Sequence, residues 1–205
     1  MAPPSLVVAT RNDHKLRELG EILAGVELQP LPAEVELPPE DGDTFTANAF
    51  IKARAAHDAT GEAAIADDSG IEAAALGGAP GVRTARYAGE DASDQENLDL
   101  LLHELDDAVD RTVTYVCVIA FVDETGDELV FEARCEGDLA REPRGTGGFG
   151  YDPAFVPRDI GDGRTMAELD PAEKHLISHR GRAARLLAGH LGVPAAAQPA
   201  PGPGP

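Results

Sequence analysis

An eleven-residue run of almost purely apolar side chains, T-V-T-Y-V-C-V-I-A-F-V at positions 112–122, constrains the fold more than any other stretch. Such a run without polar alternation predicts a strand buried on both faces at the centre of a sheet. A polar turn at 123–127 follows, and apolar and charged side chains then alternate over 131–136. That alternation predicts a hairpin partner with one solvent-facing side.

Length and charge limit the class of protein. The chain has 205 residues and is 42% hydrophobic, which predicts one domain at 1–193, or two small lobes sharing a cleft. The end of the chain, P-A-A-A-Q-P-A-P-G-P-G-P at 194–205, predicts a disordered tail. A net charge of -20 argues against nucleic acid or an anionic membrane as partner, because both would be repelled. An anionic ligand would therefore need local cations or a metal ion.

The cysteines and the N-terminus bear on the compartment. Cys117 and Cys135 lie in strand-like runs without metal-ligand spacing, which predicts buried thiols in a reducing environment. The first residues, M-A-P-P, lead straight into a short strand without a signal peptide, and no apolar run approaches the roughly 18 residues of a membrane span. We therefore expect a cytoplasmic protein.

Two adjacent carboxylates, Asp67 and Asp68, follow a short apolar run at 63–66 and precede Ser69 and Gly70. Charge at this point predicts the end of a strand. One interpretation is an Asp-Ser-Gly turn, since these residues favour turns. The other is a metal ion or an ordered set of hydrogen bonds, because two buried acids repel each other and need partners.

A strand at 5–10 leads through a polar turn into a helix for which Asn12 is the expected N-cap. This arrangement brings main-chain N–H groups, the positive end of the helix and the amine of Lys15 together, which suits a phosphate. The turn lacks the Gly-rich signature of a P-loop, so a purely structural turn is the alternative.

A second strand is predicted at 26–31 and a helix at 44–60. Lys52 lies within the mostly apolar row of that helix, where its amine either extends to solvent or points into a cleft toward an anion. A further helix begins at Ser93, with Glu96 completing a capping box.

The last helix is predicted to begin at Asp170, with Pro171 in its first turn, and to run to about residue 191. Arg180 falls in its apolar row, so the guanidinium needs a core carboxylate or a ligand as partner. Before this helix, four glycines interleave with Phe149 and Tyr151 in R-G-T-G-G-F-G-Y-D-P-A-F-V-P at 144–157. Freely turning backbone beside aromatic rings suits a flat heterocycle. The alternative is a glycine-rich hairpin whose aromatic side chains fill the core.

Five segments together resemble the non-canonical purine nucleoside triphosphate pyrophosphatases, also called inosine triphosphate pyrophosphatases or the Ham1-like family. They are A-T-R-N-D-H-K-L-R-E-L at 9–19, T-F-T-A-N-A-F-I-K-A-R at 44–54, A-D-D-S-G-I through A-R-Y-A-G at 66–89, G-T-G-G-F-G-Y-D-P-A-F-V-P at 145–157 and S-H-R-G-R-A at 178–183. The resemblance implies a mixed α/β fold with a central sheet flanked by helices, two lobes, an active cleft between them, and a homodimer. It also implies Mg²⁺-dependent hydrolysis of ITP, dITP and XTP to the monophosphate and pyrophosphate, with these nucleotides as the partners.

Transferred residue by residue, the resemblance makes Asp68 the general base and a Mg²⁺ ligand, with Lys15 and Lys52 offsetting phosphate charge. The expected substrate-binding residues are Thr10, Arg11, Asn12, Asp13, His14, Lys15, Ser69, Phe149, Gly150, Tyr151, Asp152, Lys174, His179 and Arg180.

Two positions depart from the family pattern. Pro39, with Glu40 beside it, is taken to stand where the family often has a glutamate ahead of the glycine of E-x-G-x-T-F, and Ala47 stands before the Asn-Ala of E-N-A. Glu40 is the expected second metal ligand. Its alternatives in the same loop are Glu36 and Asp41.

Three other activities compete with this hypothesis. They are a related pyrophosphatase of different base preference, a nucleotide-binding regulator without catalysis, and a plain phosphatase.

Overall fold

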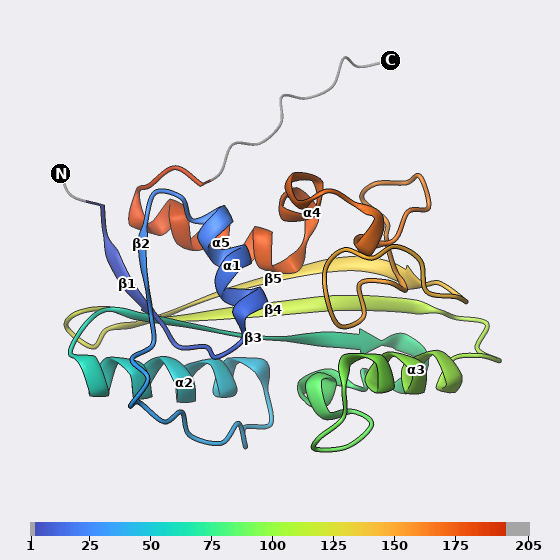
Figure 1. The fold of residues 1–205 in the computed structure, drawn as a ribbon, viewed down its shortest axis with the longest axis horizontal. Coiled ribbons are helices and arrows are strands. Elements are labelled where there is room, and N and C mark those ends of the chain that lie inside the picture. The colour runs from blue at the N-terminus through green and yellow to red at the C-terminus, as the bar shows by residue number, and fades with distance from the viewer. Residues whose placement is uncertain (1–2, 196–205) are drawn as a thin grey trace, which may run out of the picture.

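The computed structural model describes residues 3–195. Its centre is a six-stranded mixed sheet with the order β2-β1-β3-β4-β5-β6, seen edge-on in Figure 1. β1 pairs in parallel with β2 and β3, and the remaining neighbours are antiparallel. The strands are β1 (Ser5–Val8), β2 (Glu27–Pro30), β3 (Ala64–Ala73), β4 (Thr112–Val122), β5 (Glu128–Leu139) and β6 (Phe155–Pro157).

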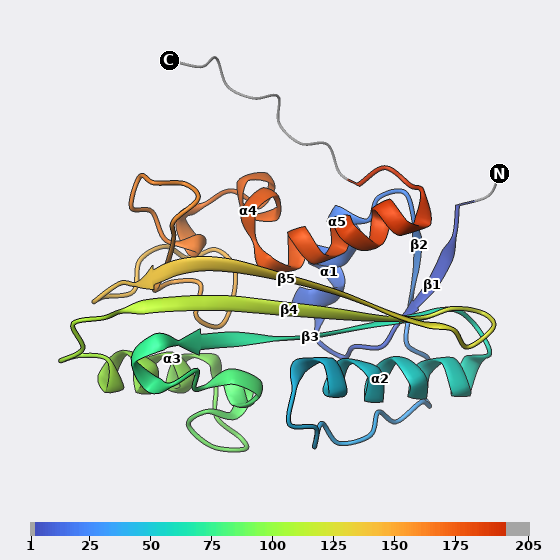
Figure 2. The same ribbon diagram turned by 180° about the vertical axis from the view of Figure 1, so that it is seen from behind.

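Helices cover both faces of the sheet (Figures 1 and 2). One face carries α1 (Asp13–Ile22), α4 (Pro171–Ile177) and α5 (His179–Leu191), and the other carries α2 (Phe45–Thr60) and α3 (Asp94–Glu104). Short 3₁₀ segments are η1 (Ala74–Leu76), η2 (Gly81–Arg86) and η3 (Met166–Glu168). The mixed α/β fold with a helix-flanked central sheet is thus confirmed. No helix within residues 3–195 has the length and apolarity needed to cross a membrane.

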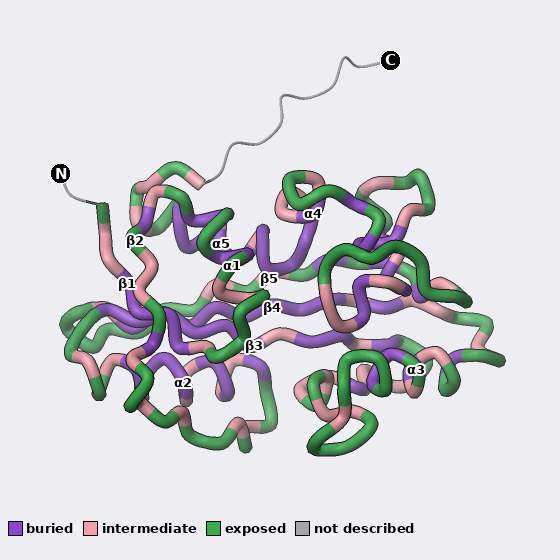
Figure 3. Tube along the Cα trace, viewed as in Figure 1, coloured by how far each residue is buried: buried purple, intermediate pink, exposed green. Residues whose placement is uncertain are grey.

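The apolar run at 112–122 forms β4, the predicted central strand, between β3 and β5. Because side chains alternate along a strand, Cys117 and Ile119 pack on the α1 and α5 side, while Val116 and Val118 pack on the α2 side. Burial runs along the middle of this strand in Figure 3. A third cluster, with Tyr115 and the side chains of α3, fills the other half of the molecule.

The first correction concerns the paired acids. The apolar run at 63–66 does not end at Asp67, because β3 continues through both acids to Ala73 and pairs with β4 along its full length. Asp67 and Asp68 therefore lie within a strand and form no turn. Lys15, Lys52 and Arg180, which belong to other elements, offset the two charges. The sequence around Asp67 and Asp68 does not show that these cations lie nearby.

The second correction concerns the last helix, which is two helices that meet at Ser178. The backbone of Ser178 is extended, so it ends α4, and its hydroxyl accepts a hydrogen bond from Gly181 N as the N-cap of α5. The junction is tight: a Cβ on Gly181 would lie 1.9 Å from the carbonyl oxygen of His175. Because glycine has no side chain, the first turn of α5 can lie this close to the backbone of α4.

Replacing Gly181 by Ala is expected to destabilise the fold by about 1–3 kcal/mol, because the added methyl group forces α4 away from α5. Chemical denaturation measures this, and turnover should fall as well. Gly189→Ala is the matched control in the same helix, since a Cβ there meets nothing within 4 Å. The control should be neutral, or more stable by up to about 1 kcal/mol through helix propensity. Equal stabilities for the two variants would contradict the prediction.

The predicted tail at 194–205 lies outside the described residues except for Pro194 and Ala195. Ala195 is partly buried and packs against the cluster that includes Leu187. The two cysteines are free and buried, as predicted.

Candidate active site

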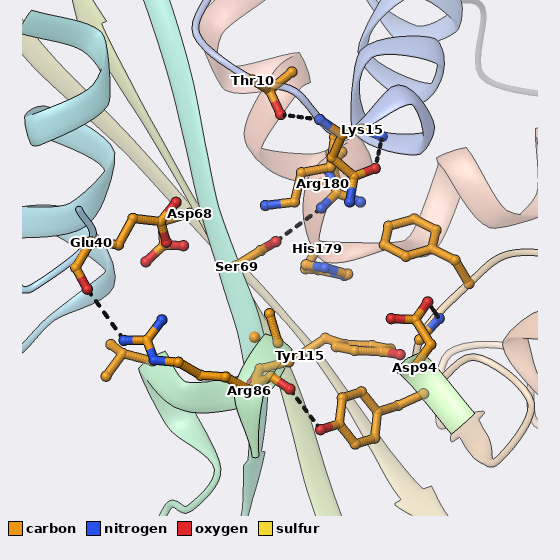
Figure 4. Close-up of a pocket in the computed structure, with 18 of the residues that line it drawn as sticks. Thr10, Lys15, Glu40, Asp68, Ser69, Arg86, Asp94, Tyr115, His179 and Arg180 are labelled. Atoms are coloured by element: carbon orange, nitrogen blue, oxygen red, sulfur yellow. Dashed lines mark hydrogen bonds between the residues drawn. The ribbon is translucent and has the colours of Figure 1, made fainter. Parts of the chain in front are cut away.

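A pocket of about 330 Å³ opens where the two halves of the sheet meet, a volume suited to a small molecule. Segments far apart in the sequence meet there (Figure 4). Its lining includes these predicted site residues: Thr10, Arg11, Asn12, Lys15, Glu40, Lys52, Asp68, Ser69, Phe149, Gly150, Tyr151, Asp152, Lys174, His179 and Arg180.

Two of the predicted substrate-binding residues, Asp13 and His14, lie outside this lining. Both occupy the first turn of α1, in which Lys15 does line the pocket; successive helical side chains point about 100° apart, so neighbours in one turn face different directions. The ring of His14 stacks on Phe149 instead, with centroids 5.1 Å apart. His14 thus contacts a lining residue without lining the pocket.

Side chains build the turn before α1. Asn12 Oδ1 accepts hydrogen bonds from the backbone N–H groups of His14 and Lys15, and Thr10 Oγ1 accepts one from Asn12 N. Asn12 is therefore the N-cap of α1, as predicted. Three backbone donors of this turn, on Asn12, His14 and Lys15, are already occupied, so the Thr10 hydroxyl and the Lys15 ammonium are the better candidates to hold phosphate at this end.

Asp67 is the buried centre of the site, and the ordered set of hydrogen bonds expected as one alternative for the paired acids is present around it. Its carboxylate accepts hydrogen bonds from Arg180 Nη2 at 2.9 Å and Nε at 3.1 Å, and Lys15 Nζ lies 3.1 Å away. Burial alone would raise the pKa of Asp67, but the charges of Lys15, Arg180 and Lys52 outweigh it and hold the pKa well below its usual range. Asp67 is therefore an ionised structural anchor that fixes two cations.

Asp68 points to the opposite side of β3, toward α2 and the pocket. It is 6% exposed, and its Oδ2 has no hydrogen-bond partner among the described residues. Burial raises its pKa above the ordinary value, although Lys52 and Lys15 act in the other direction. A carboxylate that lines a pocket and has a raised pKa is suited to accept a proton.

Lys52 points into the cleft and does not extend to solvent. Its ammonium donates to Glu40 Oε1 at 2.8 Å and to the carbonyl oxygen of Asp67 at 2.9 Å, and lies 3.7 Å from Asp68 Oδ1. These contacts position one buried cation between the two carboxylates predicted to bind metal.

The metal candidates fit Mg²⁺, which binds through one or two carboxylates together with phosphate oxygens and water. Asp68 and Glu40 both line the pocket and lie on either side of the Lys52 ammonium, so their carboxylates can serve as ligands. Residues 3–195 contain no cluster of three or more acidic, His or Cys side chains suited to a metal. Glu36 and Asp41 do not line the pocket. Glu40 stands two residues before Gly42 and so occupies the glutamate of E-x-G-x-T-F itself, which leaves Ala47 as the departure.

The far end of the pocket combines an aromatic ring with fixed cations. Lys174 Nζ bonds Glu18 at 2.6 Å and Asp152 at 2.7 Å, and lies 5.2 Å from the centroid of the Phe149 ring. Arg180 Nη1 bonds the other oxygen of Glu18 at 2.6 Å. The core-carboxylate partner predicted for Arg180 is thus present twice, in Asp67 and Glu18.

Several residues of the candidate site were not predicted from the sequence. Glu18 had a signal, a charge among the apolar side chains of α1, whereas Tyr115 was hidden within the apolar run of β4. Tyr115 stacks on His179 with centroids 4.5 Å apart and lines the pocket. Arg86 and Asp94 also line it. The glycine-rich segment lies in the long connection between β5 and β6, which pair as antiparallel neighbours, so the hairpin alternative is confirmed. Tyr151 packs in the core, as that alternative required.

His179 predicts a pH dependence of stability. Burial, Arg180 and Lys174 lower its pKa well below 6.5, so folded His179 stays neutral while unfolded His179 takes up a proton below its ordinary pKa. The unfolded state then binds more protons, and the free energy of unfolding falls as the pH drops below 6.5. Urea denaturation at about pH 7.5 and about pH 5.5 should show a loss of about 1 kcal/mol that His179→Gln removes. An unchanged pH difference in the variant would contradict the assignment.

The fold and the pocket together define an α/β protein whose cation-lined cleft, with an aromatic ring at one end, suits a nucleotide. Comparison with known proteins narrows this class: the model of the Ham1 family matches residues 6–190. The chain is 49% identical over 195 residues to the dITP/XTP pyrophosphatase of Mycobacterium tuberculosis, covering 89% of this chain and 92% of that protein. It is 48% identical to the dITP/XTP pyrophosphatase of Geobacter sulfurreducens, covering 91% and 96%.

Among solved structures, a HAM1 protein from Coxiella burnetii superimposes with a TM-score of 0.83 at 44% identity, covering 92% of this chain and 98% of that one. The chain belongs to the Ham1 family.

Proposed function

We propose that this protein hydrolyses non-canonical purine nucleoside triphosphates, ITP, dITP and XTP, to the monophosphate and pyrophosphate, and so cleanses the nucleotide pool. Family membership and the relatives named dITP/XTP pyrophosphatase support the substrate class. The observation that carries the proposal is the Asp68 carboxylate, which lines the pocket beside Lys52, with Lys15 held by the neighbouring Asp67 and the Phe149 ring at the other end. The lysine ammonium groups can offset the negative charge of the triphosphate, and the Phe149 ring can stack on the base.

In the proposed reaction, the Asp68 carboxylate accepts a proton from a water molecule whose oxygen attacks the α-phosphorus. The bond from that phosphorus to the bridging oxygen breaks, and pyrophosphate leaves with the electron pair. Lys15 and Lys52 offset the phosphate charge, which allows an acidic protein to bind an anionic substrate. A Mg²⁺ ion held by Asp68 and Glu40 would supply Lewis-acid stabilisation of the phosphate oxygens.

Base selection depends on the 6-keto group of hypoxanthine or xanthine, which accepts a hydrogen bond where the amino group of adenine donates one. Arg180 has five N–H donors, and Asp67, Glu18 and Ser69 already use four of them. At most one N–H of Nη1 therefore remains for the base. A mismatched buried polar group costs on the order of 1–3 kcal/mol, enough to discriminate against adenine.

The proposal extends to the assembly and the compartment. A homodimer follows from the family resemblance, and light scattering on the purified protein measures it directly. We place the reaction in the cytoplasm, where buried free thiols such as Cys117 and Cys135 persist.

Product analysis tests the proposed function. The protein is incubated with ITP, XTP, dITP, dUTP or GTP, with and without Mg²⁺, and pyrophosphate and orthophosphate are measured separately. We expect Mg²⁺-dependent release of pyrophosphate from ITP, dITP and XTP. Preferred hydrolysis of dUTP would indicate a different base preference, orthophosphate would indicate a phosphatase, and binding without turnover would indicate a regulator.

A further inference from the structure

Tyr115 places a hydroxyl group in the otherwise apolar middle of β4, and the proposed reaction gives it no role. Its side chain comes from the central strand, is 6% exposed and lines the active-site pocket. Figure 4 shows its ring below the ring of His179. A buried polar group needs a hydrogen-bond partner, so the partners of Tyr115 indicate what the residue does.

The ring of Tyr115 is held between two other rings. His179 stacks on it with centroids 4.5 Å apart and an interplanar angle of 15°, and Phe155 stacks on it at 4.3 Å and 26°. Two rings stacked this closely cannot share one face of a third ring, so Tyr115 lies between them. Phe155 is fully buried, and a Cβ on Gly137 would lie 2.7 Å from its ring. Phe155 thus fixes Tyr115 from behind, and Tyr115 supports the His179 ring at the pocket.

The hydroxyl of Tyr115 donates to a carboxylate that organises the glycine-rich loop. Its acceptor is Asp152 Oδ1 at 3.1 Å, and burial together with Asp152 raises the pKa of Tyr115 well above its ordinary value, so the hydroxyl keeps its proton. The other oxygen, Asp152 Oδ2, accepts from Lys174 Nζ at 2.7 Å and from Phe149 N at 2.9 Å. A Cβ on Gly148 would clash with this oxygen, so the loop can wrap the carboxylate only with a glycine there.

Tyr115 thereby connects two walls of the pocket that come from distant parts of the chain. His179 is the first residue of α5, and Phe149 belongs to the connection between β5 and β6. Both residues line the pocket. The Tyr115 ring contacts His179 directly, and its hydroxyl reaches the backbone of Phe149 through Asp152.

We propose that Tyr115 is a positioning residue that sets the shape of the base end of the pocket, an inference that rests on the proposed function. It acts through His179 and Asp152, which hold the two walls in place before the nucleotide binds. Prior ordering lowers the cost of binding, because fewer side chains and loops lose freedom when the base enters. The Tyr115 side chain makes no hydrogen bond to Asp68 within residues 3–195, so we expect it to affect binding of the base and not attack on phosphorus.

The competing explanation is that Tyr115 only fills the core, where it belongs to the same cluster as Ile71 and Leu98. The two explanations differ in which ligands they affect. A residue that positions the base end affects ligands that carry a base and leaves the binding of pyrophosphate unchanged. A residue that only fills the core affects both kinds of ligand in parallel, or neither.

Tyr115→Phe keeps both ring contacts and removes only the hydroxyl. In calorimetry on the full-length protein, we expect the affinity for IMP to fall about 3- to 10-fold, as for the loss of one hydrogen bond, and the affinity for Mg²⁺-pyrophosphate to stay within about twofold. KM for ITP should rise by a similar factor while kcat stays within about twofold. Tyr87→Phe is the matched control and should change none of these values, since its hydroxyl bonds the exposed Glu104 and Tyr87 does not line the pocket.

A double-mutant cycle tests whether the hydroxyl acts through Asp152. Asp152→Ala removes the acceptor, and Lys174 keeps its bond to Glu18. In that background, Tyr115→Phe should lower the affinity for IMP by less than about twofold further. Tyr115→Leu also removes the ring contact with His179, so it should weaken IMP binding more than Tyr115→Phe does. Thermal melting checks the fold, and Tyr115→Phe should melt within about 5 °C of the wild type.

Three results would overturn the inference while leaving the proposed function intact. They are an unchanged affinity for IMP or a parallel loss of pyrophosphate binding in folded Tyr115→Phe, an undiminished effect in the Asp152→Ala background, and equal losses in Tyr115→Phe and folded Tyr115→Leu. If the wild-type protein releases no pyrophosphate from ITP, the proposed function is wrong, and the inference fails with it.

Discussion

Replacing Asp68 by Asn is expected to lower kcat for ITP hydrolysis by about 10²- to 10⁴-fold, the usual contribution of a positioned general base. The amide keeps the size of the side chain but cannot accept the proton from water. The fold should survive, because Lys52 still donates to Glu40 and to the carbonyl of Asp67. Steady-state kinetics with ITP and Mg²⁺ measures the effect.

Glu72→Gln provides the matched control for Asp68. Glu72 lies on the same strand, pairs with Arg134 and does not line the pocket, so its replacement should leave kcat unchanged. A loss of less than about tenfold in folded Asp68→Asn would show that another group serves as the base.

Replacing Asp67 by Ala should have the largest effect on stability, a loss of about 3–5 kcal/mol in the free energy of unfolding. Its fully buried side chain compensates Lys15 and Arg180, and removal leaves buried positive charge without its partner. Turnover should fall too, because both cations then lose the anchor that fixes them in the pocket. Urea denaturation at neutral pH measures the loss in the free energy of unfolding.

An exposed ion pair gives the scale for comparison. Glu128→Gln removes the partner of Arg54 at the surface and should cost less than about 1 kcal/mol. In a double-mutant cycle, Asp67→Ala with Lys15→Met should cost less than the sum of the single changes, since the second removes an unpaired charge. Additive losses would show that Asp67 stabilises the fold through packing and not through charge.

Helix starts were predictable from short stretches. Asn12, Ser93 and Asp170 cap their helices through side-chain bonds to backbone N–H groups within a few residues. The central position of β4 was predictable as well, because a run without polar residues requires covering on both faces. Both signals lie within one segment and need no knowledge of the rest of the chain.

The residues of the candidate site were largely predictable as a set, because five segments in order resemble one family. The side chains that pair with these residues were not predictable from the sequence. Glu18 pairs with Lys174 and Arg180 across more than 150 positions of sequence, and no local pattern reports such a contact. The break at Ser178 depends on how closely Gly181 approaches His175, which is again a distance in space.

The order of residues alone predicts that the two acids side by side at 67 and 68 each need a partner, and it places one lysine in each of two predicted helices. The separate roles of the two acids follow from the three-dimensional arrangement. β3 continues through both residues, so neighbouring side chains point to opposite faces of the sheet. Asp67 meets Lys15 and Arg180, which offset its charge, while Asp68 lines the pocket beside Lys52. Strand alternation and the helices covering each face therefore separate a structural anchor from a candidate base.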